Sequence, residues 1–182
     1  MRMVDETVMM TELQSGNIDM LAGGSVGSLS PNNMELINQN EDFVIEESAG
    51  TNVEYMIPNT RNERFADKRV RQAVNYAVDV EMIVENLLLG NGEVVSGPYT
   101  SVSPYKSDKV EPLEYNPEKA RQLLEEANFD FEEPVVLMVS AGGEVRDKSA
   151  DIIQQQLEAV GMTVEQAPYD ITTWISNARE GN

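Results

Sequence analysis

The chain has 182 residues, an apolar fraction of 41% and a formal net charge of −19 from 32 acidic and 13 basic residues. Its length and apolar content are enough to bury a core, while nucleic acid and anionic membrane surfaces are disfavoured as partners, because both require clustered Lys and Arg. His and Cys are both absent, which excludes Ser-His-Asp and Cys-His nucleophile pairs, thiolate sites and ordinary zinc sites.

The first sixty residues predict two short helices and several strands. Apolar residues at helical spacing predict a helix over residues 5–15, ended by Gly16. Ser30 and Pro31 suit the N-cap and first position of a second helix over residues 30–39. Strands are expected in three short segments: residues 17–21, 43–48 and 51–59.

The stretch RFADKRVRQAVNYAVDVEMIVENLLLG, residues 64–90, contains two helix starts. Asp67 is placed to cap a helix with an apolar stripe through Val70 and Val74, and Asp79 is a second candidate N-cap before apolar residues that continue to Gly90. The caps predict either two helices or one helix with a break at Asp79.

The second half of the chain predicts a long loop and then alternating helices and strands. Residues 90–115 are rich in Gly and Pro and show little periodicity. The elements expected after it are a helix over 116–129, a strand over 134–141, a helix over 145–160, a strand over 162–169 and helical turns around Trp174. This alternation indicates the α/β class from about residue 54 onward.

The N-terminal sequence MRMVDETVMMTELQSGNIDML contains Asp5, Glu6 and Glu12. These acidic residues interrupt the apolar run that a signal peptide or a membrane span needs. The sequence therefore predicts either a cytoplasmic protein or an excised fragment of a longer one.

Five segments, in this order, resemble the family 5 extracellular solute-binding proteins, the peptide-binding components of bacterial and archaeal ABC importers. The segments are LQSGNIDML, YMIPNT, RFADKRVRQAVNYAVDVEMIVENLLLGNGEVVSGP, EYNPEKARQLLEEANF and SADIIQQQLEAVGMTVE. YMIPNT is similar to the family's Y-x-x-F-N-T hinge strand, with Pro58 in place of the usual aromatic residue.

The resemblance implies an α/β fragment of the two-lobed periplasmic-binding-protein type II fold, with a mixed sheet and packed helices. Residues 1–58 are then expected to be part of the hinge-proximal domain and residues 59–182 the first part of the C-terminal ligand-binding lobe. The implied function is that of the extracytoplasmic substrate-binding component of an ABC transporter, in the periplasm or lipid-anchored at the outer face of the cell membrane. Such a protein binds di- to oligopeptides in an interlobe cleft and delivers them to the permease subunits. We expect a monomer with no cofactor, no metal and no enzymatic activity.

The resemblance also implies that two Gly-rich loops, residues 89–97 and 140–146, face the cleft, which agrees with the tendency of ligand contacts to lie on irregular segments of a rigid scaffold. The candidate ligand-binding residues in them are Leu89, Gly90, Gly97, Ser140, Ala141, Gly142, Glu144 and Val145. For Ser140, Glu144 and Arg146, capping of the next helix or exposure to solvent is the competing interpretation. The arginines of residues 64–71 and Trp174 are interpreted as structural.

Other functions remain as alternatives. Relatives that bind a nickel complex, haem or oligosaccharide leave the substrate open, and the acidic composition also suits a cytoplasmic interaction module. A hydrolase based on carboxylates would use Glu125, Glu126 or Asp170, although the glutamates are expected on an ordinary solvated helix face.

Overall fold

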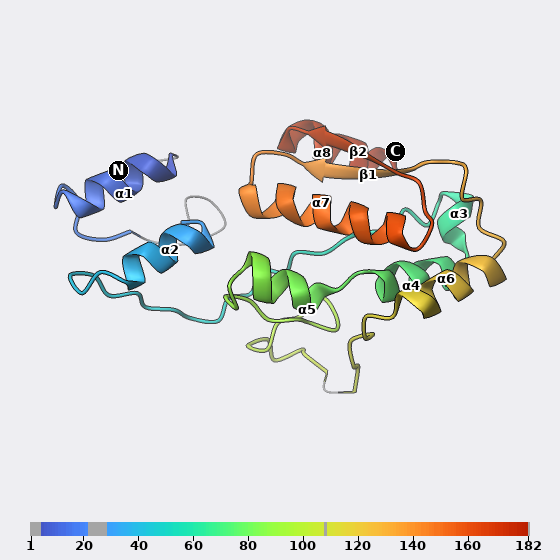
Figure 1. The fold of residues 1–182 in the computed structure, drawn as a ribbon, viewed down its shortest axis with the longest axis horizontal. Helices are drawn as coiled ribbons and strands as arrows, with labels where there is room; N and C mark the ends of the chain where they lie inside the picture. Colours follow the sequence, from blue (N-terminus) through green and yellow to red (C-terminus); the bar gives the residue numbers. More distant parts are fainter. Residues whose placement is uncertain (1–4, 22–28, 108, 182) are drawn as a thin grey trace.

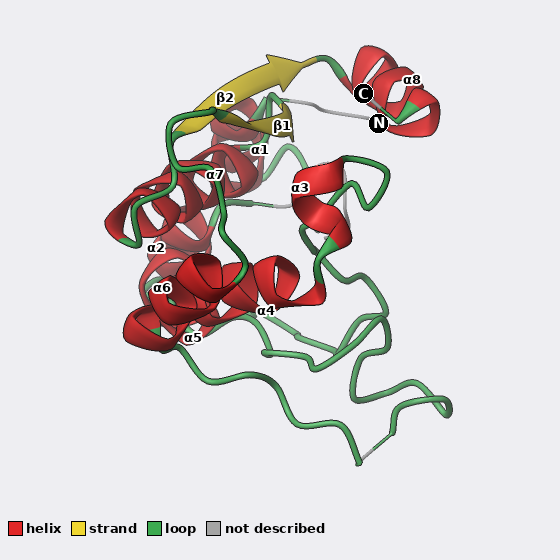
Figure 2. Ribbon diagram, turned by 90° about the vertical axis from the view of Figure 1, so that its right-hand side faces the viewer, coloured by secondary structure: helices red, strands yellow, loops and turns green. Residues whose placement is uncertain are grey.

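The computed structural model describes residues 5–21, 29–107 and 109–181 (Figure 1). Its elements in chain order are α1 (Glu6–Gln14), α2 (Pro31–Asn38), α3 (Glu63–Ala66), α4 (Lys68–Ala77), α5 (Val80–Met82), the π-helical turn η1 (Ile83–Leu87), α6 (Pro117–Glu126), β1 (Val135–Ser140), α7 (Glu144–Ala159), β2 (Val164–Tyr169) and α8 (Ile171–Glu180). Figures 1 and 2 show α7 between the sheet on one side and α4, α5 and α6 on the other, while α1 and α2 lie together at one end of the molecule.

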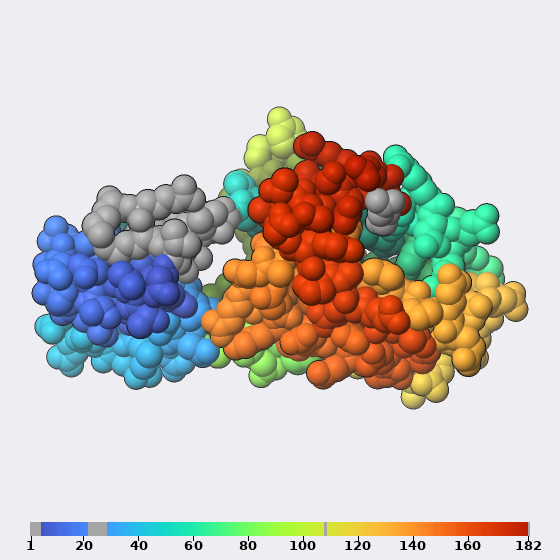
Figure 3. All heavy atoms as spheres, turned by 90° about the horizontal axis from the view of Figure 1, so that it is seen from above, coloured from blue at the N-terminus to red at the C-terminus, as the bar shows by residue number. Residues whose placement is uncertain are grey.

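The two N-terminal helices form a small packed unit. Met10 and Leu13 of α1 and Ile37 of α2 are buried against one another. The backbone N–H of Ser30, the N-cap of α2, donates to the Glu6 side chain. Phe43 and Ile45 also pack against this cluster. Ile45 is the member of the cluster that lies furthest along the sequence. The space-filling view places this unit at one end of the molecule (Figure 3).

The main core is built on the packing of α4 against α6. Ala73 and Ala120 are 1% and 0% exposed, and side chains this small allow two helices to approach closely. Leu124, also 0% exposed, fills the centre of a cluster that extends to α7 and both strands. The backbone N–H of Asn116, the N-cap of α6, donates to the Tyr76 carbonyl at 2.8 Å and joins the start of α6 to the end of α4.

The C-terminal third forms a β-α-β unit. Strands β1 and β2 pair in parallel, with a register that runs from Val135 opposite Val164 to Ser140 opposite Tyr169. A parallel pair needs a crossover connection, and α7 provides it. The helix α8 packs against both strands, and its Trp174 indole donates to the Met138 carbonyl at 3.3 Å.

The arginines of the first scaffold helices have structural roles, as the sequence predicts. The Arg64 guanidinium lies 4.6 Å from the centre of the Phe129 ring and donates to the Asp130, Glu133 and Pro134 carbonyls at 2.6–2.9 Å. Arg71 donates to the carbonyls of Phe65 and Ala66, at the end of α3, at 2.7 Å. These contacts hold α3 and the turn before β1 against the core.

The α/β class and every predicted helix are confirmed, but three predicted strands are wrong. Residues 17–21, 43–48 and 51–59 form no strand in the structure, because apolar alternation marks a half-buried surface and a strand also needs a partner edge. In the described part of the chain the sheet has two strands and parallel pairing only, so no mixed pairing is present there. Asp67 and Asp79 cap two separate helices, and the short α3 and the turn η1 were not predicted.

None of the helices in the described ranges has both the length and the apolar character needed to span a membrane.

Leu124→Ala should lower the free energy of unfolding by about 2–5 kcal/mol, because it removes a buried side chain and leaves a cavity between α4 and α6. Urea unfolding followed by the fluorescence of Trp174, the single Trp of the chain, measures this change. Leu113→Ala is the matched control, since Leu113 is 44% exposed in the loop before α6. Equal losses in the two variants would contradict the assignment of Leu124 to the core.

Asp67, the N-cap of α4, should titrate far below an ordinary aspartate. Hydrogen bonds from the Arg69 side chain and backbone lower its pKa from 3.8 to about 2. Since the folded-state pKa is depressed, the carboxylate's stabilising contribution is fully present above pH 3.8 and is lost as the pH falls through about 2. Arg69→Gln should move the midpoint, measured by carboxyl-carbon NMR, upward toward 3.8.

Asp170 provides an internal reference in the same spectra. Its pKa is lowered by a side-chain hydrogen bond from Thr173 and by backbone hydrogen bonds that do not involve Arg69. If Arg69→Gln moved the titration midpoint of Asp170 as far as that of Asp67, the change would be a general electrostatic effect and not a local one.

Candidate functional site

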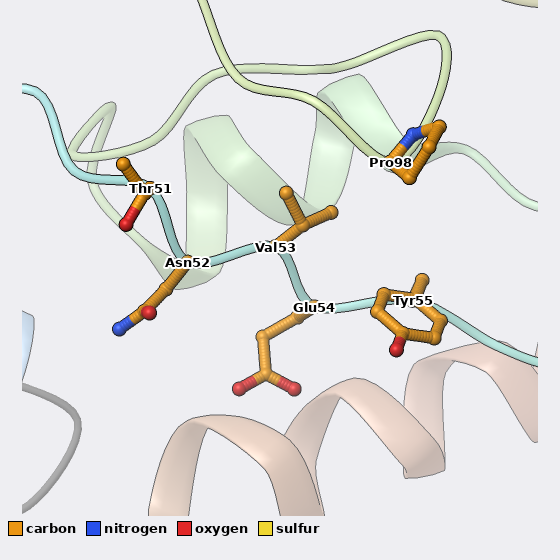
Figure 4. Close-up of a pocket in the computed structure, with 6 residues that line it drawn as sticks. All are labelled: Thr51, Asn52, Val53, Glu54, Tyr55 and Pro98. Atoms are coloured by element: carbon orange, nitrogen blue, oxygen red, sulfur yellow. The ribbon is translucent and has the colours of Figure 1, made fainter. Parts of the chain in front are cut away.

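A hollow of about 390 Å³ lies between the segment that joins the two packed units and the loop that follows η1. We call residues 46–58 the crossing segment. Thr51, Asn52, Val53, Glu54 and Tyr55 line one wall of the hollow, and Pro98 lines the other (Figure 4). Pro98 comes from the loop on the far side, while the Glu54 carboxylate points toward a helix (Figure 4).

That helix is α7, and the contact is an ion pair. The Arg146 guanidinium donates to a Glu54 carboxylate oxygen at 3.2 Å and to the Ser140 carbonyl at 3.3 Å. The side chain of Arg146 is 44% exposed and that of Glu54 is 81% exposed. Water and salt therefore screen this pair, and its stabilising contribution is small.

The loop between β1 and α7 has a well-defined conformation. Ser140 is buried at the end of β1, and the N–H of Ala141 continues the strand pairing by donating to the Tyr169 carbonyl at 2.9 Å. Gly142 has φ +98°, a conformation that L side chains rarely adopt, and its N–H donates to the Asp147 carboxylate at 3.3 Å. Glycine at this position allows the chain to turn from the strand directly into α7.

The remaining two predicted residues of this loop belong to the first turn of α7. Glu144 is exposed and accepts a hydrogen bond from Lys148, one turn later, at 2.5 Å. Val145 is half-buried. The contacts of Glu144 in this structure are those of a solvated helix residue, which is the competing interpretation.

The loop that follows η1 begins with a left-handed turn. Leu89 has φ +52° and Gly90 has φ +80°, and the N–H of Gly90 donates to the Val84 carbonyl at 3.0 Å. This turn ends the π-helical segment. Because η1 packs against α7, the loop that leaves η1 and the loop that leads into α7 are both attached to this packed pair.

Further along this loop, Glu93 serves as an anchor. Its carboxylate accepts a hydrogen bond from the Ser101 hydroxyl at 2.5 Å and lies 3.5 Å from the Lys106 ammonium. The Ser101 hydrogen bond, with the charge of Lys106, lowers the pKa of Glu93. These polar contacts join the part of the loop before Pro98 to the part after it.

None of the eight predicted residues is among those that line the hollow. Gly97 precedes the lining residue Pro98, and Ser140 is connected to the hollow through Arg146 and Glu54. The ligand contacts of these residues stay a prediction. No local pattern marks the crossing segment as a wall of the site, although the resemblance of YMIPNT to a hinge strand points to this part of the chain.

The metal-site and hydrolase alternatives can be compared with the described residues. No group of three or more Asp or Glu side chains there is arranged to hold a metal ion. Asp170, a candidate for the hydrolase alternative, caps α8 and accepts hydrogen bonds from the backbone of Thr172 and Thr173 and from the Thr173 hydroxyl. These bonds lower its pKa, whereas a general acid needs a raised one.

The chain belongs to the bacterial extracellular solute-binding proteins, family 5: the family model, described as the middle part, matches residues 1–182. Heme-binding protein A of Haemophilus influenzae is 29% identical over 97% of this chain and 32% of its own length. The oligopeptide-binding protein AppA of Bacillus subtilis is 37% identical over 59% of this chain and 22% of its own length. The chain thus spans about a third or less of the length of these curated relatives.

A solved structure confirms the fold. The ABC transporter-associated periplasmic binding protein DppA from Helicobacter pylori, in complex with the peptide STSA, superposes with a TM-score of 0.81 at 23% identity, over 95% of this chain and 32% of that protein. The chain therefore has the mixed α/β architecture of part of a two-lobed periplasmic binding protein.

Gly142→Ala should destabilise the loop before α7. A side chain at φ +98° is strained even though nothing lies within 4 Å of the added Cβ, and we expect a loss of about 1 kcal/mol or more in the free energy of unfolding. Gly97→Ala is the matched control, because its surroundings are equally empty and its φ lies outside the left-handed region. Urea denaturation of both variants distinguishes conformational strain from a general intolerance of alanine.

Proposed function

We propose that this chain forms part of the ligand-binding cleft of an extracytoplasmic substrate-binding component of an ABC importer, and that the ligand is a peptide. The observation that carries the proposal is the hollow between the crossing segment and Pro98, which lies on the loop after η1, next to a packed scaffold of helices and sheet. Ligand sites in such proteins lie in concave places where loops from a rigid framework meet.

We further propose that residues 1–58 are part of a hinge-proximal domain and residues 59–182 are the first part of the C-terminal lobe. Two separate apolar clusters support this division: one ends at Ile45 and the other begins at Phe65. The crossing segment between them has no helix or strand and is mostly exposed. Segments of this kind absorb the backbone rotations of hinge closure.

Peptide is favoured over other ligands by the chemistry of the crossing segment. Within the described residues, the backbone of residues 51–55 makes no hydrogen bond in a helix, strand or turn, so its N–H and C=O groups are available to the main chain of an added peptide. The similarity to an oligopeptide-binding protein supports the same ligand class. Haem is the second candidate, since a heme-binding protein is similar over 97% of this chain.

The remaining parts of the proposal follow the family. We infer that the protein acts outside the cytoplasm, delivers its ligand to the permease subunits, works as a monomer and catalyses no reaction on it. Binding with release, without chemistry, agrees with a hollow lined by the hydroxyl, amide, carboxylate and apolar side chains of residues 51–55 and by Pro98.

The test is a thermal-shift titration with a pool of di- to hexapeptides, with hemin and a nickel–histidine complex as separate arms and free amino acids as the control. It is run on this chain and on the gene product that carries it. Ligand at about a hundred times its dissociation constant should add roughly 2.7 kcal/mol to the free energy of unfolding. A shift in the gene product with peptides alone supports the proposal. A shift with hemin or nickel alone, or none in any arm, overturns the peptide assignment.

A further inference from the structure

We propose that Arg146 is a positioning residue: its guanidinium couples the position of the crossing segment to the conformation of the loop between β1 and α7. The inference rests on the proposed division of the chain at the crossing segment. It goes beyond that division, because it assigns the coupling to one ion pair and makes the coupling sensitive to salt.

The crossing segment has few other attachments. In the part of the chain that the structure describes, the Glu54–Arg146 contact is the one hydrogen bond or ion pair that a side chain of residues 46–58 makes. Val53 and Pro58 are half-buried, while the other residues of the segment are exposed. Apolar packing therefore contributes little to its position, and the ion pair has a correspondingly large share in it.

Charge makes this contact specific. Residues 41–60 contain five acidic residues and no Lys or Arg, in a chain whose net charge is −19. The segment therefore experiences general repulsion from the rest of the molecule. Arg146 supplies the local cation that reverses this repulsion at one point, Glu54.

The same guanidinium defines the shape of the loop. One of its nitrogens donates to the carbonyl of Ser140, the last residue of β1, and the other to Glu54. Arginine can do this because its donors are held in a planar fork, which a lysine cannot reproduce. When the crossing segment moves and Glu54 is withdrawn, Arg146 loses one of its two acceptors, and the constraint on Ser140 weakens with it.

An exposed pair is suited to this role. For an exposed ion pair, the populations of the joined and separated states differ by only a few-fold. The contact can therefore form and break during a domain motion. A buried pair would hold the segment in one position, because separating its charges is costly.

The experiment uses double electron–electron resonance on the full 182-residue chain. The chain has no Cys, so nitroxide labels at Glu35→Cys on α2 and Gln155→Cys on α7, both exposed positions, report the distance between the two packed units. Glu54→Gln and Arg146→Gln should each raise the population outside the main distance peak by about two- to five-fold. The charge swap Glu54→Arg with Arg146→Glu should bring it back toward the native value.

Two controls separate the pair from a general effect of charge. Glu47→Gln removes one negative charge from the same segment without touching Arg146, and it should leave the distance distribution unchanged. In about 1 M salt the Debye length falls to about 3 Å. The distance distribution of the native chain should then approach those of the two glutamine variants, whose own distributions should change little with salt.

The coupling to the loop has its own measurement. The amide resonance of Gly142, whose N–H is bonded to Asp147, should shift in Glu54→Gln and not in Glu47→Gln. Unchanged distances in Glu54→Gln and Arg146→Gln, or equal broadening in Glu47→Gln, would overturn the proposal. No ligand enters these experiments, so their outcome is independent of whether peptides bind.

Discussion

Arginine side chains that donate to backbone carbonyls hold the ends of helices and strands in this chain. Arg69 bonds to the carbonyl of Glu126 at the end of α6, and Arg121 bonds to the carbonyl of Ala159 at the end of α7. The C-terminal end of a helix carries unpaired carbonyls and a partial negative charge. A cation there can donate hydrogen bonds to those carbonyls and interact favourably with that charge. In a protein with so few basic residues, most of the cations that contact the scaffold fix element ends. The Arg146 bond to Ser140 repeats this pattern at the end of a strand, with Glu54 as an additional acceptor.

The helices could be predicted from the sequence, and the strands only in part. Helix starts are encoded locally: Asp67, Asp79 and Asn116 each accept a hydrogen bond from a backbone N–H two or three residues later, and a sequence displays that spacing directly. Strand partners are not local. The segments 134–141 and 162–169 form strands because α7 brings them side by side, whereas the segments 43–48 and 51–59 have no partner edge in the described residues.

The candidate site shows the same limit. The glycines of the two loops were recognisable, and the positive φ angles of Gly90 and Gly142 give them a conformational reason to be there. The Glu54–Arg146 contact joins residues 92 positions apart, and no local pattern marks either residue. A resemblance to a family hinge strand indicated the region of Glu54, but its partner could only come from the three-dimensional arrangement.

The crossing segment and the scaffold are stabilised by different physics. The scaffold depends on apolar burial around Leu124, which salt affects little, whereas the crossing segment depends on an exposed ion pair, which salt weakens. A change in ionic conditions can therefore alter the position of the segment and, through Arg146, the loop before α7, while the strands and helices of the β-α-β unit keep their structure. A binding protein gains from this separation, because closure of the cleft needs a movable connection and ligand recognition needs a rigid surface.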